Sequence, residues 1–547
     1  MITASTLSVP ERKAYARRSL EPASLLSGYS LVLLLTLVYV AAFTIIASVL
    51  HQTHGFPLDD SYIYQTVARN LGLHGRLGFM ADRPSSGATS LLWALIQAAN
   101  YRFFAVDPVW YNLSISYLLF ACVGPLLFLL CRRDALPVPL CLALAVAPAL
   151  MGNFLWLGMI GMEHLLFVVL SLAEIYFWLQ PAPRPRYNIW ICGGISGLFA
   201  ITRPEDVIVG PLLILLSFSG RFVRSRRDRF ILFATWLPFV CLTIATNFWT
   251  SGSAMPATLH GRSWLYFHQS GGPHSLRTIL RFLGSWLERI PRQFSPLFVH
   301  QPNSIRDIFS PAALLALVLL IVMIRGAVWI VAKRRPGLGF LLLWAAIQFV
   351  IYLVTFPAAG HGGRYQPLNL FLMLPLLALG MYGFLQSLRR SPNIPVAGAY
   401  VVVLVAGALS LSTWRQVTLV GIQHINNTEA QVASWLRLHV TASVPFAAFD
   451  IGRVSYEWGG QVVDLGGLVD PDYVHYLTEG RVPEYLKAHK VEYLMLPGVG
   501  IHDMGFNTSW LPPSLVEYCS PAKPWLLGFR YTIHAVRCQD VYRLSTP

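Results

Sequence analysis

Long apolar runs recur along the chain and alternate with short polar segments. Eleven of them approach the roughly 20 apolar residues that a helix needs to cross a bilayer. They cover residues 27–50, 109–130, 137–154, 163–179, 188–203, 205–219, 231–250, 309–331, 339–356, 367–386 and 394–414. The run at 188–203 is short and ends beside Pro204. The runs at 188–203 and 205–219 could therefore form one broken helix, and the number of spans could change by about two.

The composition agrees with this pattern. The chain is 55% hydrophobic and only 12% charged, which excludes a soluble multidomain protein and an intrinsically disordered one. Seven cysteines in 547 residues are too few for a disulfide scaffold. The sequence therefore predicts a polytopic α-helical membrane protein with about 11 transmembrane helices.

The net charge of +15 lies on one side of the predicted membrane domain. The odd-numbered gaps between runs, beginning with residues 1–24, hold 19 Lys and Arg residues against four Asp and Glu residues, and the rest of the chain holds 22 of each kind. By the positive-inside rule the basic gaps face the cytoplasm. We therefore expect a cytoplasmic N-terminus, and the basic charge needs no nucleic-acid partner to explain it.

Most of the polar residues outside the runs lie on the opposite, outer side, in residues 51–107, 251–308 and 415–547. The last segment alternates helix and strand patterns. Its helix patterns lie at 428–440 and 483–490, and its strand patterns at 446–450, 461–465 and 492–496. We expect a membrane domain over 1–414 and a soluble outer α/β domain over 415–547. The two cysteines of the soluble domain, Cys519 and Cys538, are a candidate disulfide on an oxidising side of the membrane.

Two adjacent carboxylates, Asp59 and Asp60, lie a few residues beyond the first run. Paired carboxylates at a membrane surface are costly to desolvate and suit proton abstraction, metal binding or a basic substrate. The structural alternative is capping, with Asp60 or Ser61 beginning a helix that runs to about Asn70 and ends at Gly72. A cap needs only one Asp, so the pair favours a function.

Further polar clusters fall at the outer ends of predicted spans. They are Glu163 with His164, Arg203 with Glu205 and Asp206, His260 with Arg262, and His361 with Arg364 and Tyr365. Each one alone is compatible with snorkelling or an interfacial ion pair. Together on one side, carboxylates for base chemistry and arginines for phosphate charge suit a site that handles a lipid phosphate. The sequence motifs of nucleotide hydrolases, zinc proteases and α/β-hydrolases are absent.

Short motifs in a fixed order connect these clusters to a known superfamily. The Asp pair is followed by ARNL at 68–71, GATSLLW at 87–93, GME at 161–163, TRPE at 202–205, MPAT at 255–258 and GGRY at 362–365. The chain thereby resembles the GT-C superfamily of polyprenyl-phosphate-sugar-dependent glycosyltransferases, and within it the branch of the mycobacterial terminal arabinofuranosyltransferases. The resemblance covers residues 55–380 and, more loosely, 450–471. Ala257 and the stretch His260-Gly261-Arg262 depart from that branch, which argues against an arabinose donor.

The resemblance implies a bacterial inner-membrane enzyme with a periplasmic C-terminal domain. It would move a sugar, with inversion, from a polyprenyl phosphate to an acceptor hydroxyl of a cell-envelope glycan, lipid or protein. Asp59 or Asp60 would be the general base, deprotonating the acceptor hydroxyl. The residues that would bind the donor phosphate are Arg203, Arg262 and Arg364, and those that would contact the substrates are Glu163, His164, Glu205, His260, His361 and Tyr365.

Three alternatives remain open. No cofactor is expected, but the Asp pair could bind a divalent metal, although two adjacent carboxylates make a thin metal site. A multispan transporter would need ionisable residues near mid-span and inverted repeats. A non-catalytic GT-C-like scaffold is the third alternative, and the presence of both Asp residues and of the arginines argues against it.

Overall fold

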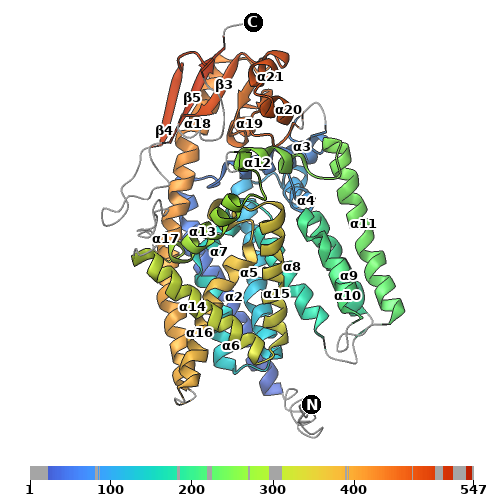
Figure 1. The fold of residues 1–547 in the computed structure, drawn as a ribbon, viewed down its shortest axis with the longest axis vertical. Coiled ribbons are helices and arrows are strands. Elements are labelled where there is room, and N and C mark those ends of the chain that lie inside the picture. The colour runs from blue at the N-terminus through green and yellow to red at the C-terminus, as the bar shows by residue number, and fades with distance from the viewer. Residues whose placement is uncertain are drawn as a thin grey trace.

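The computed structural model describes most of the chain. The described residues are 22–80, 84–85, 87–180, 185, 187–218, 225–268, 271–294, 311–388, 391, 393–470, 472–498, 509–520 and 537–544. They form a helical bundle with a smaller α/β domain stacked on one end of it (Figure 1). The fold class predicted from the sequence, a polytopic helical protein with a C-terminal α/β domain, is confirmed.

Seven helices of the described chain are long and apolar enough to cross a membrane. Six are α2 (Pro22–Thr53), α5 (Pro108–Arg133), α11 (Arg226–Ser251), α14 (Pro311–Ala332), α15 (Pro336–Thr355) and α16 (Pro367–Ser387), and the seventh begins with α17 (Asn393–Asn427). The pair α6 (Val138–Leu150) and α7 (Gly152–Met159), bent by 53°, would make an eighth.

Each of the eleven predicted runs coincides with helical structure, but three of the helices are shorter than the roughly 20 residues that cross a bilayer. These are α8 (His164–Trp178), α9 (Tyr187–Thr202) and α10 (Val209–Leu216). Between α9 and α10 the chain forms a 3-10 turn, η3 (Pro204–Ile208). Proline lacks a backbone N–H and fixes its φ, so the helix ends before Pro204.

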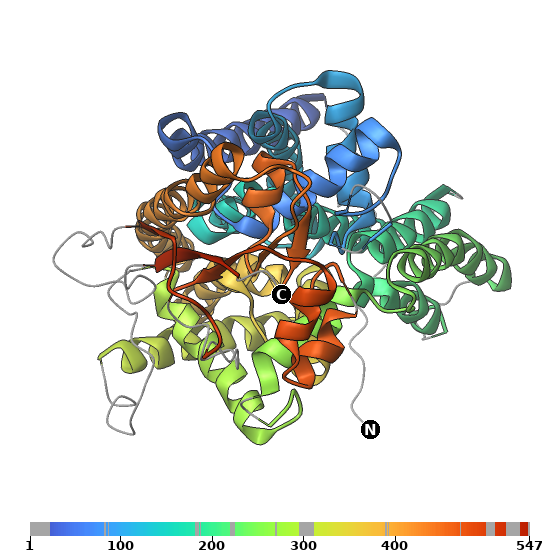
Figure 2. The same ribbon diagram turned by 90° about the horizontal axis from the view of Figure 1, so that it is seen from above.

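Burial separates the centre of the bundle from its periphery. In the most apolar 18-residue window of α16, 78% of residues are buried, whereas in that of α11 only 11% are. On α16, a Cβ at Gly380 would collide with the backbone oxygen of Val322 on α14, so glycine permits close helix contact. Helices α9, α10 and α11 stand together at one side of the bundle (Figure 2).

The first outer segment forms α3 (Asp59–His74), α4 (Leu91–Ala99) and the π-turn η2 (Asn100–Phe104). The capping interpretation of the Asp pair is wrong, because the N-cap of α3 is Leu58 and no side chain caps this helix. The helix also continues past Gly72 and ends at Gly75, whose φ of 66° is left-handed. Gly72 instead lies against the carbonyl oxygen of Ala98 on α4.

The second outer segment contributes α12 (Ala257–Phe267) and α13 (Leu276–Arg292). On α13, one face exposes Leu276, Leu280, Leu283 and Leu287, while Phe282, Trp286 and Ile290 on another face are buried. A helix with an exposed apolar stripe beside membrane-spanning helices is typical of a helix lying at a bilayer surface.

The C-terminal domain contains one five-stranded sheet in the order β2-β1-β3-β5-β4. The strands are β1 (Phe446–Ala448), β2 (Val462–Asp464), β3 (Tyr493–Pro497), β4 (Val516–Ser520) and β5 (Arg537–Arg543). β1 is parallel to β2 and β3, and β5 runs antiparallel to β3 and β4. Four helices accompany the sheet: α18 (Glu429–His439), α19 (Gly452–Trp458), α20 (Tyr473–Thr478) and α21 (Val482–Ala488).

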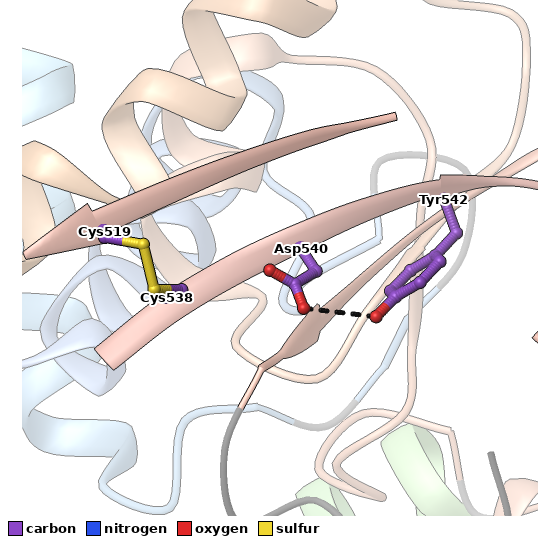
Figure 3. The surroundings of a disulfide bond; sticks show 4 residues. All are labelled: Cys519, Cys538, Asp540 and Tyr542. Atoms are coloured by element: carbon purple, nitrogen blue, oxygen red, sulfur yellow. Dashed lines mark hydrogen bonds between the residues drawn. A yellow bond between two sulfur atoms is a disulfide. The ribbon is translucent and has the colours of Figure 1, made fainter. Parts of the chain in front are cut away.

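All five helix and strand patterns predicted in this domain coincide with observed elements. The predicted boundary at residue 414 falls inside α17, which continues without a break from the bundle to Asn427 and is followed directly by α18. The candidate cysteines, Cys519 on β4 and Cys538 on β5, are joined in a disulfide between paired positions of the two strands (Figure 3).

Candidate functional site

The two carboxylates of the first outer segment occupy the first turn of α3 and have different partners. Both oxygens of Asp59 accept backbone N–H groups of the C-terminal domain, from Gly452 and Arg453, each at 2.7 Å. These N–H groups begin α19, where a helix has no internal acceptors for them. Asp59 therefore caps α19, a helix nearly 400 residues away in the sequence.

Asp60 lies between two arginines. Its Oδ1 accepts Nη2 of Arg262, on α12, at 2.9 Å, and its Oδ2 accepts Nη2 of Arg364. Burial alone would raise the pKa of Asp60, but the two guanidinium groups outweigh burial and hold it well below its usual value. Asp60 is therefore ionised at neutral pH and neutralises one unit of the positive charge of the two arginines.

Asp59 has the opposite electrostatic character. Burial and the nearby carboxylate of Asp450 raise its pKa to about 7, although the N–H groups of Arg453 and Gly452 favour its ionised form. Two adjacent residues of one helix thus differ in environment, with Asp59 at the domain junction and Asp60 beside cationic side chains.

A glycine-rich loop between α15 and α16 positions Arg364 and Tyr365. Its short turn η7 (His361–Gly363) contains Gly362 with a φ of 64°, and a Cβ there would collide with the ring of Trp156. Arg289 of α13 donates to the carbonyl of Gly360 at 2.9 Å, which fixes the start of the loop. The loop thereby turns Arg364 toward Asp60, with only 2% of the arginine side chain exposed.

Arg203 is surrounded by carboxylates. It donates to Glu205 at 2.6 and 2.8 Å and lies 3.9 Å from Glu163 and 3.7 Å from Asp206. It also donates to the Tyr352 hydroxyl at 2.7 Å and, at 3.0 Å, to the carbonyl oxygen of the residue that follows Arg364. Because a buried charge is costly unless it is paired, this cluster holds the arginine in place. Of the three arginines predicted to bind phosphate, Arg203 is the one that is surrounded by several carboxylates.

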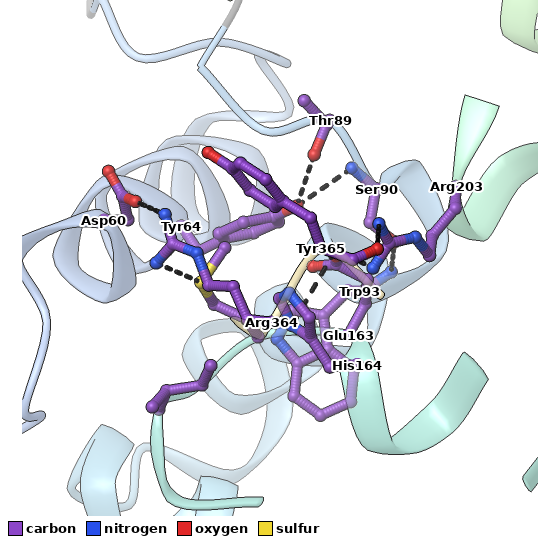
Figure 4. Close-up of polar contacts among 12 residues, drawn as sticks. Asp60, Tyr64, Thr89, Ser90, Trp93, Glu163, His164, Arg203, Arg364 and Tyr365 are labelled. Atoms are coloured by element: carbon purple, nitrogen blue, oxygen red, sulfur yellow. Dashed lines mark hydrogen bonds and ion pairs between the residues drawn. The ribbon is translucent and has the colours of Figure 1, made fainter. Parts of the chain in front are cut away.

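Of the remaining predicted residues, Glu163, His164 and Tyr365 lie near Arg203 and Arg364 (Figure 4). Tyr365 accepts a hydrogen bond from Arg262 at 3.1 Å and stacks on Tyr352 with ring centroids 5.7 Å apart. His361 is exposed on the loop, and its charge contributes to the low pKa of Asp60. His164 is buried beside Glu163. His260 lies on α12, but its side chain is outside the described residues.

Several buried polar atoms near the site have no hydrogen-bond partner within the described part of the chain. They are Nη1 of Arg203, Nε of Arg364 and Nδ1 of His164. Buried polar groups in proteins are usually satisfied, so these atoms are exceptions, although Nη1 of Arg203 and Nδ1 of His164 each lie 3.9 Å from Oε1 of Glu163.

Sequence reasoning missed two residues of this region, Tyr64 and Thr89. The Tyr64 hydroxyl lies 3.0 Å from the Thr89 hydroxyl and accepts the backbone N–H of Ser90 at 3.0 Å. Tyr64 follows Asp60 by four residues, so both lie on one face of α3, and this spacing could have identified it.

Beside Thr89, a cavity opens between the first outer segment and helices α9 and α11. On α11 its wall is formed by Thr243, Thr246, Asn247 and Thr250, which share one helix face. The apolar part of the wall consists of Val67, Leu77, Ala88, Leu91, Ala94, Ala200 and Ile201. The cavity is small, and the hydroxyls of Thr243, Thr246 and Thr250 donate to backbone carbonyl oxygens.

Glu517 with Cys519 and Cys538 is the one group with metal-ligand spacing among the described residues. The two cysteines form the disulfide, and a disulfide supplies no thiolate ligand. The predicted metal independence of the Asp pair remains a prediction.

Residues 398–535 match a family described as a domain of unknown function (DUF8728). The match covers most of α17 and of the C-terminal domain. No curated protein matches the chain.

Two solved structures of ArnT from Cupriavidus metallidurans are similar to this chain. The one bound to undecaprenyl phosphate has a TM-score of 0.49 and 13% sequence identity, and the apo structure has a TM-score of 0.48 and 14% identity. Both comparisons cover 92% of this chain and 97% of the ArnT chain. Similarity at this level carries no conclusion about substrate or activity. The arabinofuranosyltransferase branch is not among these matches.

Proposed function

We propose that the protein is an integral membrane glycosyltransferase of GT-C type. It transfers a sugar from a polyprenyl-phosphate donor to an acceptor hydroxyl of a cell-envelope glycan, lipid or protein, on the periplasmic face of a bacterial inner membrane. The observation that carries the proposal is Asp60, an ionised carboxylate held by Arg262 and Arg364 at the end of the bundle that bears the C-terminal domain. The disulfide of that domain agrees with an oxidising side.

The charge balance of this centre supports a specific sequence of events. Without substrate, Asp60 occupies both arginines. A phosphate offers the same kind of acceptor oxygens, and arginine binds it with two parallel hydrogen bonds. The donor phosphate takes Arg262 and Arg364 from Asp60. The released carboxylate loses the positive charges that lower its pKa and becomes a stronger base.

The transfer step then balances. Asp60 accepts the proton of the acceptor hydroxyl while the acceptor oxygen attacks the anomeric carbon from the face opposite the phosphate. The bond between the anomeric carbon and the phosphate oxygen breaks, and its electron pair stays on the phosphate, where Arg262 and Arg364 stabilise the charge. The products are the glycosylated acceptor with inverted configuration and polyprenyl phosphate. A positioned base contributes roughly 100-fold to 10,000-fold to such a rate.

The other residues support this centre. In the proposal, Arg203 is a positioning residue, because it binds the backbone of the glycine-rich loop through the carbonyl oxygen of Tyr365. Glu163 and Glu205 belong mainly to its charge cluster.

The decisive experiment is a transfer assay with the protein purified into lipid nanodiscs. Polyprenyl-phosphate sugars are offered as donors with a mixed envelope glycan as acceptor, and mass spectrometry reads the product. We expect one donor to give a product in the wild type and none in Asp60→Asn. Transfer that persists undiminished in Asp60→Asn would remove the proposed base. Movement of a solute across sealed vesicles, without any transfer, would favour a transporter instead.

A further inference from the structure

The C-terminal domain contacts both of the outer elements that carry the Asp60–Arg262 pair. Asp60 lies on α3 and Arg262 on α12, about 200 residues apart in the sequence. The two elements have separate connections to the membrane bundle. Both elements contact the C-terminal domain, most of which lies within residues 398–535, the segment that matches a domain of unknown function.

The contact with α3 is polar and lies next to Asp60. Asp59 accepts the first two N–H groups of α19. The guanidinium of Arg453 donates to the Tyr62 hydroxyl and lies over its ring at 4.4 Å. Two turns further along α3, Arg69 donates to the carbonyl oxygen of Tyr456 at 2.9 Å. These contacts follow one side of α3 and tie it to α19, while Ser61 on the same helix donates to the carbonyl oxygen of Ile160 in the bundle.

The contact with α12 is a close approach of two backbones. A Cβ at Gly261 would collide with the carbonyl oxygen of Gly467, and a Cβ at Gly467 would come within 2.9 Å of the Gly261 Cα. Gly261 directly precedes Arg262. On the other side, Asp464 fixes the loop by accepting the N–H groups of Gly466 at 2.6 Å and Val469 at 2.8 Å. The α12 backbone therefore rests on a rigid loop of the C-terminal domain.

We propose that the C-terminal domain is a clamp that sets the position of Arg262 relative to Asp60. It holds α3 through Asp59 and Arg453 and holds α12 through Gly467, so the base and a phosphate-binding arginine meet only when this domain is in place. The proposal assigns a positioning role to a domain of unknown function and rests on the proposed transfer reaction at Asp60. Asp59, Arg453 and Gly467 are positioning residues, since they act through α3 and α12.

The test adds a methyl group at the contact between the two backbones and compares it with a matched control variant. Gly467→Ala adds a Cβ against Gly261, whereas Gly480→Ala adds one in the same domain with no heavy atom within 4 Å. Both glycines have left-handed φ values, of 65° and 70°, so backbone strain is the same in both. A displacement of about 1 Å at a catalytic centre costs on the order of 100-fold in rate. We expect kcat to fall by about that factor in Gly467→Ala and to stay unchanged in Gly480→Ala.

A double variant separates positioning from loss of folded protein. In Arg262→Gln the clamp has no guanidinium left to position, so adding Gly467→Ala should lower kcat no further. If the decrease in kcat of the double variant equals the product of the decreases of the two single variants, Gly467→Ala acts independently of Arg262, and the clamp is overturned. If Gly467→Ala does not fold, Gly261→Ala places the wedge from the α12 side. Its control is Gly284→Ala, where no heavy atom lies within 4 Å of the added Cβ.

A distance measurement tests the clamp without any sugar transfer. Spin labels at Leu73→Cys and Met255→Cys, both at exposed positions beside the two elements, report the separation of α3 from α12. The exposed Cys122 and Cys241 are first replaced by serine. We expect the distance distribution to shift in Gly467→Ala and not in Gly480→Ala. An unchanged distribution overturns the clamp. If the wild type transfers no sugar but the distance distribution still shifts in Gly467→Ala, only the proposed function is overturned.

Discussion

At the scale of single residues, adjacency in the sequence does not mean a shared role. The sequence predicts that Asp59 and Asp60 are a functional pair, because two carboxylates exceed what a helix cap needs. Their separate partners could not be identified. Adjacent residues on a helix project about 100° apart, and the partners of Asp59 lie nearly 400 residues further along the chain.

The displacement of Asp60 by phosphate predicts opposite effects on binding and on catalysis. Asp60→Asn removes the charge that competes for Arg262 and Arg364. The variant should bind undecaprenyl phosphate more tightly, by roughly tenfold, because a hydrogen bond to a charged group is worth about 1.5–3 kcal/mol. Transfer should be lost. Isothermal titration in nanodiscs measures the affinity, and Asp472→Asn is the control, since it removes an exposed carboxylate of the C-terminal domain and leaves both arginines occupied. Weaker binding by Asp60→Asn would contradict the displacement.

The surroundings of Arg203 predict a structural effect of its substitution. Arg203→Gln leaves Glu163, Glu205 and Asp206 without their shared cation, and breaking a buried ion pair costs about 3–5 kcal/mol. Thermal unfolding in detergent should show a large decrease in Tm. Arg481→Gln is the matched control, because Arg481 pairs with Glu479 and Glu484 at the surface and its loss should change Tm little. An equal Tm in both variants would contradict the structural role.

At the scale of elements, the amphipathic patterns of the sequence locate helices well but not their contacts. The patterns at 428–440 and 483–490 match α18 and α21 because helix and strand periodicity is a local property. The sequence already marks the run at 188–203 as short and the pair around Pro204 as a possible broken helix, and the chain does turn there, between α9 and α10. The TRPED stretch already places two acidic residues beside Arg203, which was a signal for the charge cluster.

The junction between α3 and α19 predicts a dependence of stability on pH. The pKa of Asp59 is raised from 3.8 to about 7 in the folded protein. Between these values the folded state binds more protons than the unfolded state, so this residue makes the protein less stable as pH rises. Thermal unfolding should show a smaller loss of Tm from about pH 4 to about pH 7 in Asp59→Asn than in the wild type. Asp472→Asn, at an exposed position of the C-terminal domain, should retain the wild-type dependence of Tm on pH.

At the scale of the whole molecule, the sequence predicts the two parts and their sidedness but not how they join. Charge partition and apolar runs are summed over many residues, so local errors in span length leave the arrangement intact. The contact between Gly261 and Gly467 leaves no such signature, because a glycine in a loop or near a helix end is equally typical of an ordinary turn. The residue types around Asp60 could therefore be predicted from the sequence, while their contacts with the C-terminal domain could not.

The unbroken helix α17 has a mechanical consequence. Its 35 residues form a rod roughly 50 Å long, and α18 and the sheet domain follow it directly. A membrane of different hydrophobic thickness changes the tilt of such a rod. The displacement is largest at the end of the helix that carries the C-terminal domain. Transfer rates measured in nanodiscs of increasing acyl-chain length should pass through an optimum, and a rate indifferent to thickness would contradict this coupling. In the proposed function, lipid composition would then regulate transfer without contacting the residues around Asp60.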